Sequence, residues 1–351
     1  MSMFLRPILL GPSLLILLLG VGYPLFWFYV AGQVEDGFLR WRDARNQKGY
    51  VVEHGALDVG GFPGAVRLKI AAPAIASTKD GWSVRSVGAV FEIQPWNWRR
   101  YRVDATGPHQ LTGVVQGRPL QVAAETGSAW FIGRVNSRGR MAEGAANIQD
   151  LLVSQPDGDQ LSATKHVQAQ LRWPDDTASS GPPSFDLTVQ ASDTQLAKKI
   201  SGPLGPDLRI FRLSGTLNGK PPGKLQRDAL DAWRQDGGTI DIRQIALGWG
   251  ALDMTANGTL ALDAALRPLG AFTAEVRGHR AMLSALEQNG KLRRREASAA
   301  RLALDLLSKP GGNGDGRRVV TVPLTAQKGR LYLGPVRLLK LPPILPPAPS
   351  G

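Results

Sequence analysis

The chain has no cysteine among its 351 residues. This absence excludes a disulfide framework, a thiolate zinc site, an iron–sulfur cluster and a cysteine nucleophile. Histidine is scarce as well, and the four histidines, at positions 54, 109, 166 and 279, lack the spacing of a zinc-binding helix. The sequence also contains no G-x-S-x-G nucleophile elbow and no complete phosphate loop. We therefore expect no catalytic residues, no metal and no cofactor, and we do not expect an enzyme.

Charged residues are absent from Ile8 to Val30, close to the start of the chain. A helix needs about 20 mainly apolar residues to cross a bilayer, so this segment is long enough to span one. The alternative is a cleaved signal peptide, whose apolar region is only about 7–15 residues long and is followed by small residues. This segment is longer and ends in aromatic residues, so we predict an uncleaved, single-pass anchor. Basic residues on both sides of the segment leave its orientation open.

Alternation of apolar and polar residues dominates the remainder of the chain. The alternating runs are Val66–Ile70 and Val167–Trp173, with shorter ones around residues 185–189, 240–242, 260–262, 272–276 and 331–333. This period of two indicates strands with one apolar and one polar face, as in antiparallel sheets. Helical patterns cover residues 33–49, 193–200, 225–235 and 280–307, the last with a break at Asn289-Gly290. The predicted fold class is α+β, predominantly antiparallel β, with a transmembrane helix followed by a curved, hairpin-built sheet and a few packed helices.

Composition divides the chain at a segment rich in proline, serine and aspartate, which lacks large apolar residues. The predicted divisions are an anchor at 1–32, a first β-rich half at 33–173, a linker at 174–184, a second β-rich half with helices at 185–340, and a proline-rich tail at 341–351. The tail is expected to be extended.

A short turn is predicted at Gly61-Phe62-Pro63-Gly64. Glycine tolerates positive φ and proline holds φ near about −65°, so together they favour a tight reversal. The turn is expected to hold Val66–Ile70 in register with the strand before it. We also expect the Phe62 ring to be buried.

The densest charge cluster consists of Lys291, Arg293, Arg294 and Arg295. One interpretation is a solvated helix face. The other is contact with anionic lipid headgroups, worth about 1 kcal/mol for each basic residue near the surface. Nucleic acid is a further anionic partner for a chain with a net charge of +13, but no recognition motif is present and we expect none.

Two tryptophans stand two residues apart, at Trp96 and Trp98, which places both indoles on one side of a strand. Packing in the core is one use of such a pair. An exposed platform for an apolar ligand or a membrane is the other.

Two sets of short motifs carry a family resemblance. Near the predicted anchor they are Trp41, Gly49, Tyr50, Gly55, Leu57 and Gly61-Phe62-Pro63, and toward the C-terminus they are Gly237–Ile242, Leu247–Gly250, Gly258–Asp263 and Gly329–Pro335. Together they resemble an uncharacterised group of proteobacterial envelope proteins, domain of unknown function 2125. The C-terminal half is also similar to AsmA-like proteins. The resemblance implies an inner-membrane anchor with the bulk of the chain in the periplasm, and the AsmA-like part implies an apolar groove and lipid handling.

The function that we expect is non-enzymatic lipid handling or maintenance of the cell envelope through an apolar sheet face. The alternative is an anchored scaffold that uses the same sheet as a closed core and binds another envelope protein. A hydrolase of envelope polymers is the least favoured hypothesis. The expected partners are the inner membrane, through Ile8–Val30, and either phospholipid or another envelope protein.

Overall fold

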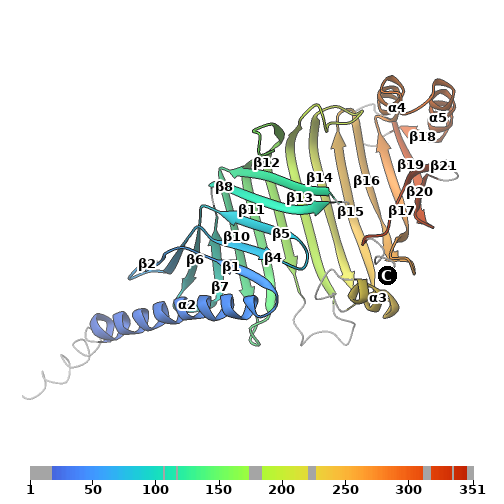
Figure 1. Ribbon diagram of the computed structural model, residues 1–351. Coiled ribbons are helices and arrows are strands. Elements are labelled where there is room, and N and C mark those ends of the chain that lie inside the picture. The colour runs from blue at the N-terminus through green and yellow to red at the C-terminus, as the bar shows by residue number, and fades with distance from the viewer. Residues whose placement is uncertain are drawn as a thin grey trace, which may run out of the picture. The chain divides into compact units, whose positions relative to one another are not determined.

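Figure 1 shows the computed structural model of the chain, which describes residues 18–105, 107–115, 118–173, 184–219, 227–310, 318–333 and 336–345. The chain forms two compact units. The first comprises Met1–Arg140 with Val153–Asp159, and the second comprises Met141–Leu152 with Gln160–Gly351. Strand pairs in both units are antiparallel, and the sheet is not closed. The predicted fold class is therefore confirmed in its main part, a predominantly antiparallel β structure with a few helices.

The first unit is a meander of strands that bend. Its strands are β1 (Tyr50–Glu53), β2 (Leu57–Gly60), β3 (Val66–Ala71), β4 (Ala74–Ser77), β5 (Trp82–Ser86), β6 (Gly88–Gln94), β7 (Asn97–Asp104), β8 (Gly107–Val115), β9 (Arg118–Thr126) and β10 (Ser128–Val135). One run of paired strands is β1–β4–β5–β8–β9, and the other is β2–β3–β6–β7–β10. Elements such as β1 and β2 are thus successive parts of one bent strand, each paired in a different run.

A long helix, α2 (Tyr23–Asn46), follows one π-helical turn, η1 (Leu18–Gly22), and packs on β1, β2 and β3. Trp27 and Ala31 are buried on its inner side against Val66. The helix includes most of the segment 33–49 that the sequence predicts as helical. No helix in the described part of the chain is both long enough and apolar enough to cross a membrane. The predicted span Ile8–Val30 lies within the described residues only from Leu18 onward.

The turn between β2 and β3 has the predicted register but not the predicted burial. Leu57 lies opposite Ile70 and Gly60 opposite Arg67, as the turn at residues 61–64 requires. Gly61 has a φ of +108°, and a Cβ there would overlap the carbonyl oxygen of Ala65, so the position needs glycine. The expectation that Phe62 is buried is wrong, because its side chain is 48% exposed. The buried ring that holds this turn comes from α2 instead.

The second unit is a meander in which helices are inserted, three of them in the residues that the structure describes. Its elements are β11 (Met141–Ser154, as far as Leu152), β12 (Gln160–Arg172), β13 (Ser184–Leu196), β14 (Asp207–Asn218), α3 (Arg227–Gln235), β15 (Thr239–Trp249), β16 (Leu252–Leu262), β17 (Pro268–Arg277), α4 (His279–Gln288), α5 (Arg294–Leu307), β18 (Ser308–Pro310), β19 (Arg318–Gln327), β20 (Arg330–Leu333) and β21 (Val336–Lys340). Neighbouring strands pair in the order β12–β13–β14–β15–β16–β17–β19–β20–β21. The helices predicted at 225–235 and at 280–307 with a break are confirmed as α3, α4 and α5.

One segment of the second unit differs from the sequence-based expectation. Residues 193–200, predicted helical, form the end of β13 and a turn. Thr194 lies opposite Thr164 on β12 and opposite Leu208 on β14, so pairing on both sides overrides the local helical preference. The predicted linker at 174–184 lies outside the described residues except for Ser184, and β12 and β13 on either side of it pair within one unit. Along the chain, the two compact units meet near Arg140.

Candidate functional site

Two rows of apolar side chains cross the second unit from β12 to β19. Residues that lie directly opposite each other in an antiparallel sheet point to the same face. Each row contributes one apolar residue from each of β12, β13, β14, β15, β16, β17 and β19. The rows, called the apolar face below, are Val167, Ala191, Phe211, Leu247, Met254, Val276 and Val320, and Ala169, Val189, Leu213, Ile245, Ala256, Ala274 and Val322. The predicted alternation thus produces one continuous apolar surface.

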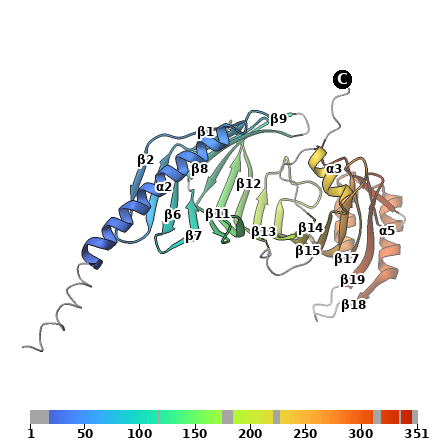
Figure 2. The ribbon, with the colours of Figure 1, turned by 90° about the horizontal axis from the view of Figure 1, so that it is seen from below.

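The apolar face is covered unevenly. Over β17 and β19 three of its four residues are buried, since Ala274 and Val320 have 0% exposure and Val322 has 4%, while Val276 is half-buried. Leu304 of α5 packs against this part, and Figure 2 shows α5 alongside β19. Over β12, β13 and β14 the residues of both rows are only half-buried. The cover of the apolar face thus decreases from β19 toward β12.

A second helix closes the apolar side near the other ends of the strands. Leu230 and Trp233 of α3 form a cluster with Leu262 and Leu266, against which Leu345 of the tail also packs. The indole Nε1 of Trp233 donates a hydrogen bond of 2.9 Å to the carbonyl oxygen of Asn218. α3 therefore ends the apolar surface with a buried ring whose polar atom is satisfied.

A bulge in β15 keeps the apolar surface continuous. The register shifts between Ser214 and Gly215 in β14, and between Ile242 and Ile245 in β15. Because β15 has one extra residue here, Ile242 and Ile245 both lie on the apolar side, and Arg243 turns to the opposite side. Arg243 Nη1 donates hydrogen bonds of 2.6 Å to Asp186 Oδ1 and to Thr216 Oγ1.

The opposite side of the same strands is polar. It has a depression of about 390 Å³ lined by Gln168, Gln170, Thr188, Gln190, Arg212, Ser214, Arg243 and Gln244. Its side chains bind one another: Arg212 Nε donates a 2.9 Å hydrogen bond to Gln190 Oε1, and the hydrogen bond from Arg243 lowers the pKa of Asp186 below its ordinary value. One side of this sheet is thus apolar, and the other carries polar side chains that hydrogen-bond to one another.

The predicted basic cluster lies at the beginning of α5. Lys291 and Arg293 precede the helix, Arg294 and Arg295 form its first turn, and all four side chains are exposed. Glu296 is committed to the helix start, because its Oε2 accepts a 3.0 Å hydrogen bond from the backbone N–H of Arg293. The solvated-face interpretation and the anionic-lipid interpretation both fit this exposure.

Further along α5, apolar side chains face outward as well as inward. Leu304 packs inward, while Leu302 and Leu306 are 66% and 80% exposed and lie four residues apart on one side of the helix. A helix with exposed leucines and a basic end has the composition of helices that lie on anionic membrane surfaces.

Asp305 ties α5 to α4. Arg280 donates two hydrogen bonds to its carboxylate, from Nε at 2.8 Å and from Nη2 at 2.9 Å, and His279 Nε2 lies 3.0 Å from Oδ1. These hydrogen bonds, that from Arg280 first, lower the pKa of Asp305 from 3.8 to about 2. A carboxyl group whose pKa is lower in the folded chain stabilises the fold above its unfolded pKa, and this stabilisation is lost as the pH falls from about 4 to 2.

We therefore expect Asp305→Asn to lower the melting temperature at pH 6, because the ion pair is lost, and to weaken the further loss of stability between pH 4 and pH 2. Thermal unfolding at pH 6, pH 4 and pH 2, monitored by circular dichroism, checks this. Asp236→Asn is the matched control, since Asp236 is exposed and the same change of side chain is made there. An equal acid sensitivity of the wild type and Asp305→Asn would contradict the assignment.

The two tryptophans predicted as a pair lie in different elements. Trp96 is in the turn between β6 and β7 and is 63% exposed, and Trp98 is the second residue of β7 and is 57% exposed. Both therefore belong to a surface and not to the core. Trp98 lines a hollow of about 320 Å³ together with Phe26, Val30 and Val34 of α2, among others. In the sequence, the aromatic end of the apolar segment is the only sign of a contact between α2 and these indoles.

No metal site is found in the residues that the structure describes, because no three His, Asp or Glu side chains there lie close enough together to hold a metal ion.

Among known proteins, residues 27–342 match a family that is described as "Uncharacterized protein conserved in bacteria (DUF2125)". No curated protein and no solved structure matches the chain.

Proposed function

The chain belongs to the DUF2125 family of bacterial proteins, and from the surfaces of this member we propose a non-enzymatic function in lipid handling at the cell envelope. In this proposal the chain is held in the inner membrane by Ile8–Val30, and its bulk lies in the periplasm. The half-buried part of the apolar face receives the acyl chains of a phospholipid. The AsmA-like resemblance of the C-terminal half stays a prediction.

The observation that carries the proposal is the uneven cover of the apolar face. Rows of apolar residues continue unbroken from β12 to β19, but their buried members are Ala256, Ala274, Val320 and Val322, the cluster against which Leu304 of α5 packs. Apolar surface removed from water contributes about 25 cal/mol per Å², so the half-buried rows over β12, β13 and β14 favour an apolar ligand. The polar groups on the other side already bind one another, and they offer less to a ligand.

Two further features support a membrane-bound chain. The segment from Ile8 to Val30 has no charged residue, and its length suits a bilayer. The basic cluster at the beginning of α5, with the exposed Leu302 and Leu306 beyond it, combines the two interactions by which helices bind anionic lipid surfaces.

Photocrosslinking tests the proposal on the full-length chain. The protein is reconstituted in vesicles that contain a phospholipid with a diazirine in its acyl chain, and the adducts are located by peptide mass spectrometry. We expect adducts on the apolar face, at Val189 and Leu213. We expect Leu213→Gln to reduce them, because it places an amide in the apolar row. Ser214→Gln is the matched control: it adds the same side chain to the same strand on the polar side.

Adducts confined to the first 34 residues would contradict lipid binding by the sheet. That result favours the scaffold hypothesis, in which the same face is a core or binds another envelope protein. Circular dichroism of both variants separates loss of lipid contact from loss of the fold.

A further inference from the structure

An aromatic cluster joins the start of α2 to the turn between β2 and β3. Trp27 is buried, and its indole Nε1 donates a hydrogen bond of 2.9 Å to the carbonyl oxygen of Gly64. The Phe62 ring meets Trp27 edge to face at a centroid distance of 5.6 Å. It also stacks on Phe28, with centroids 5.9 Å apart and ring planes 9° apart. The buried indole therefore holds the turn on the helix, and the two phenylalanines form the outer layer.

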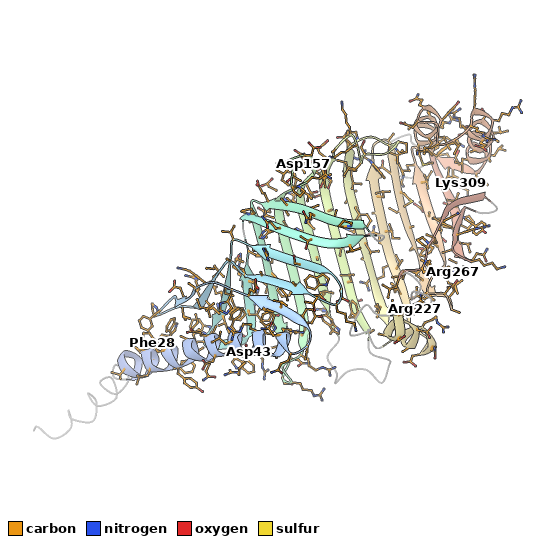
Figure 3. All side chains as sticks on the ribbon, in the orientation of Figure 1. Phe28, Asp43, Asp157, Arg227, Arg267 and Lys309 are labelled. Atoms are coloured by element: carbon orange, nitrogen blue, oxygen red, sulfur yellow. The ribbon has the colours of Figure 1, made fainter. Side chains whose placement is uncertain are left out.

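The two rings of the outer layer expose much of their apolar surface to water, which is unfavourable. Phe28 is 63% exposed and Phe62 is 48% exposed, although they are two large rings in contact. Phe26 and Tyr29 on α2 are exposed as well, at 46% and 65%. Figure 3 shows Phe28 at the N-terminal end of α2. Several large exposed rings gathered at one end of a helix mark a contact surface.

The turn between β6 and β7 lies at the same end of the first unit. β3 pairs with β6 so that Val66 is opposite Ile93, which places the two turns on one side. The exposed Trp98 and Phe26 of α2 line one hollow there. The guanidinium carbon of Arg99 lies 5.4 Å from the Trp98 ring centroid, and the Arg99 side chain is exposed. Aromatic rings and a cation thus occupy one end of the unit.

Chain continuity and charge identify the partner. The uncharged segment from Ile8 runs into this end of α2, and Phe28 follows Leu19 by only about 14 Å of helix. No acidic residue occurs before Glu35. Aromatic rings favour the membrane–water interface, and arginine beside them suits anionic headgroups. A protein partner could also bind these rings. A bilayer is favoured because the predicted anchor is continuous with this end of α2 and holds the rings close to the membrane.

We propose that Phe26, Phe28, Tyr29, Phe62 and Trp98 rest in the headgroup region of the bilayer that holds the predicted anchor. The turn at residues 61–64 is then a membrane contact, and the first unit meets the bilayer with this end. The inference rests on the anchoring part of the proposed function, but not on lipid binding by the apolar face of the second unit.

Site-specific labelling tests the inference, because the chain has no cysteine and a single introduced thiol is unique. Phe62→Cys in the full-length chain is labelled with an environment-sensitive fluorophore and reconstituted in vesicles of phosphatidylethanolamine and phosphatidylglycerol. Val87→Cys is the matched control: Val87 is 64% exposed and lies beside the opposite end of the β3–β6 pair, about 17 Å away along the strand. Phe28→Cys provides a second position in the cluster.

We expect a blue shift and quenching by headgroup-labelled lipids at positions 62 and 28, and neither at position 87. A chain that sediments with the vesicles but shows no quenching at 62 and 28 would overturn the inference and leave the anchor intact. Equal quenching at all three positions would also overturn it, since no one end then faces the bilayer. Failure to sediment would reject the anchor and the inference together, whereas the crosslinking test reports on the apolar face alone.

Discussion

Trp27→Ala is expected to lower the free energy of unfolding of the first unit by about 3–5 kcal/mol, the usual cost of deleting a buried large ring. Trp27 is 2% exposed, packs with Val66 and Ala31, and donates a hydrogen bond to Gly64. Its loss would leave a cavity and an unpaired carbonyl group at the turn. Urea unfolding in detergent, monitored by hydrogen exchange of the β3 amides, measures the effect.

The matched control is Phe28→Ala, one residue further along the same helix. Phe28 is 63% exposed, so we expect a cost of only about 1 kcal/mol, the value of its ring contacts. The two variants also separate stability from membrane contact. Phe28→Ala should weaken the quenching signal at position 62 while leaving the fold intact. Equal costs for both substitutions would show that α2 does not pack on the turn through Trp27.

The second large effect is expected from Trp233→Ala in α3. Trp233 is 5% exposed and lies in one cluster with Leu230, Leu262 and Leu266. We expect a loss of about 3–5 kcal/mol in the second unit, because the ring closes the apolar side near the ends of its strands. Gln235→Ala, at an exposed position of the same helix, is expected to stay within about 0.5 kcal/mol. Urea unfolding followed by circular dichroism compares the variants.

Gly238 supplies an independent check on this packing. A Cβ at Gly238 would overlap the Trp233 ring, so Gly238→Ala should destabilise the wild type strongly. In the Trp233→Ala background the same substitution has space and should cost much less, which gives a clear non-additivity in a double-mutant cycle. Additive costs would argue that α3 does not cover the strands as the structure shows.

The relation between sequence and fold differs between the two units. In the second unit, long strands alternate strictly, as in Val167–Trp173, and the period of two shows which residues share a face. The strands of the first unit bend after four to nine residues, and the strands from β8 to β11 alternate weakly, so the sequence does not predict them. Local helical preference also failed at residues 193–196, because pairing of Thr194 on both sides prevails.

The candidate sites show the same limit. Charge density alone located the basic cluster, because exposed cations need no partner to be recognised. The sequence pattern does not show that Leu302 and Leu306 are exposed on the same helix, because leucines at helical spacing are usually buried. Likewise, neighbouring aromatic residues in the sequence do not indicate which ring is buried.

The sequence by itself determined the class of the fold, the apolar and polar sides of its long strands, the register at the turn of residues 61–64, and the uncharged segment at Ile8–Val30. These features depend on neighbours along the chain. Only the tertiary structure decided that Trp27 is buried while Phe28 and Phe62 are exposed, and that the apolar face is covered by α5 but half-buried over β12, β13 and β14. The physical reason is that burial depends on which distant element packs against a residue, and a repeating pattern does not carry that information.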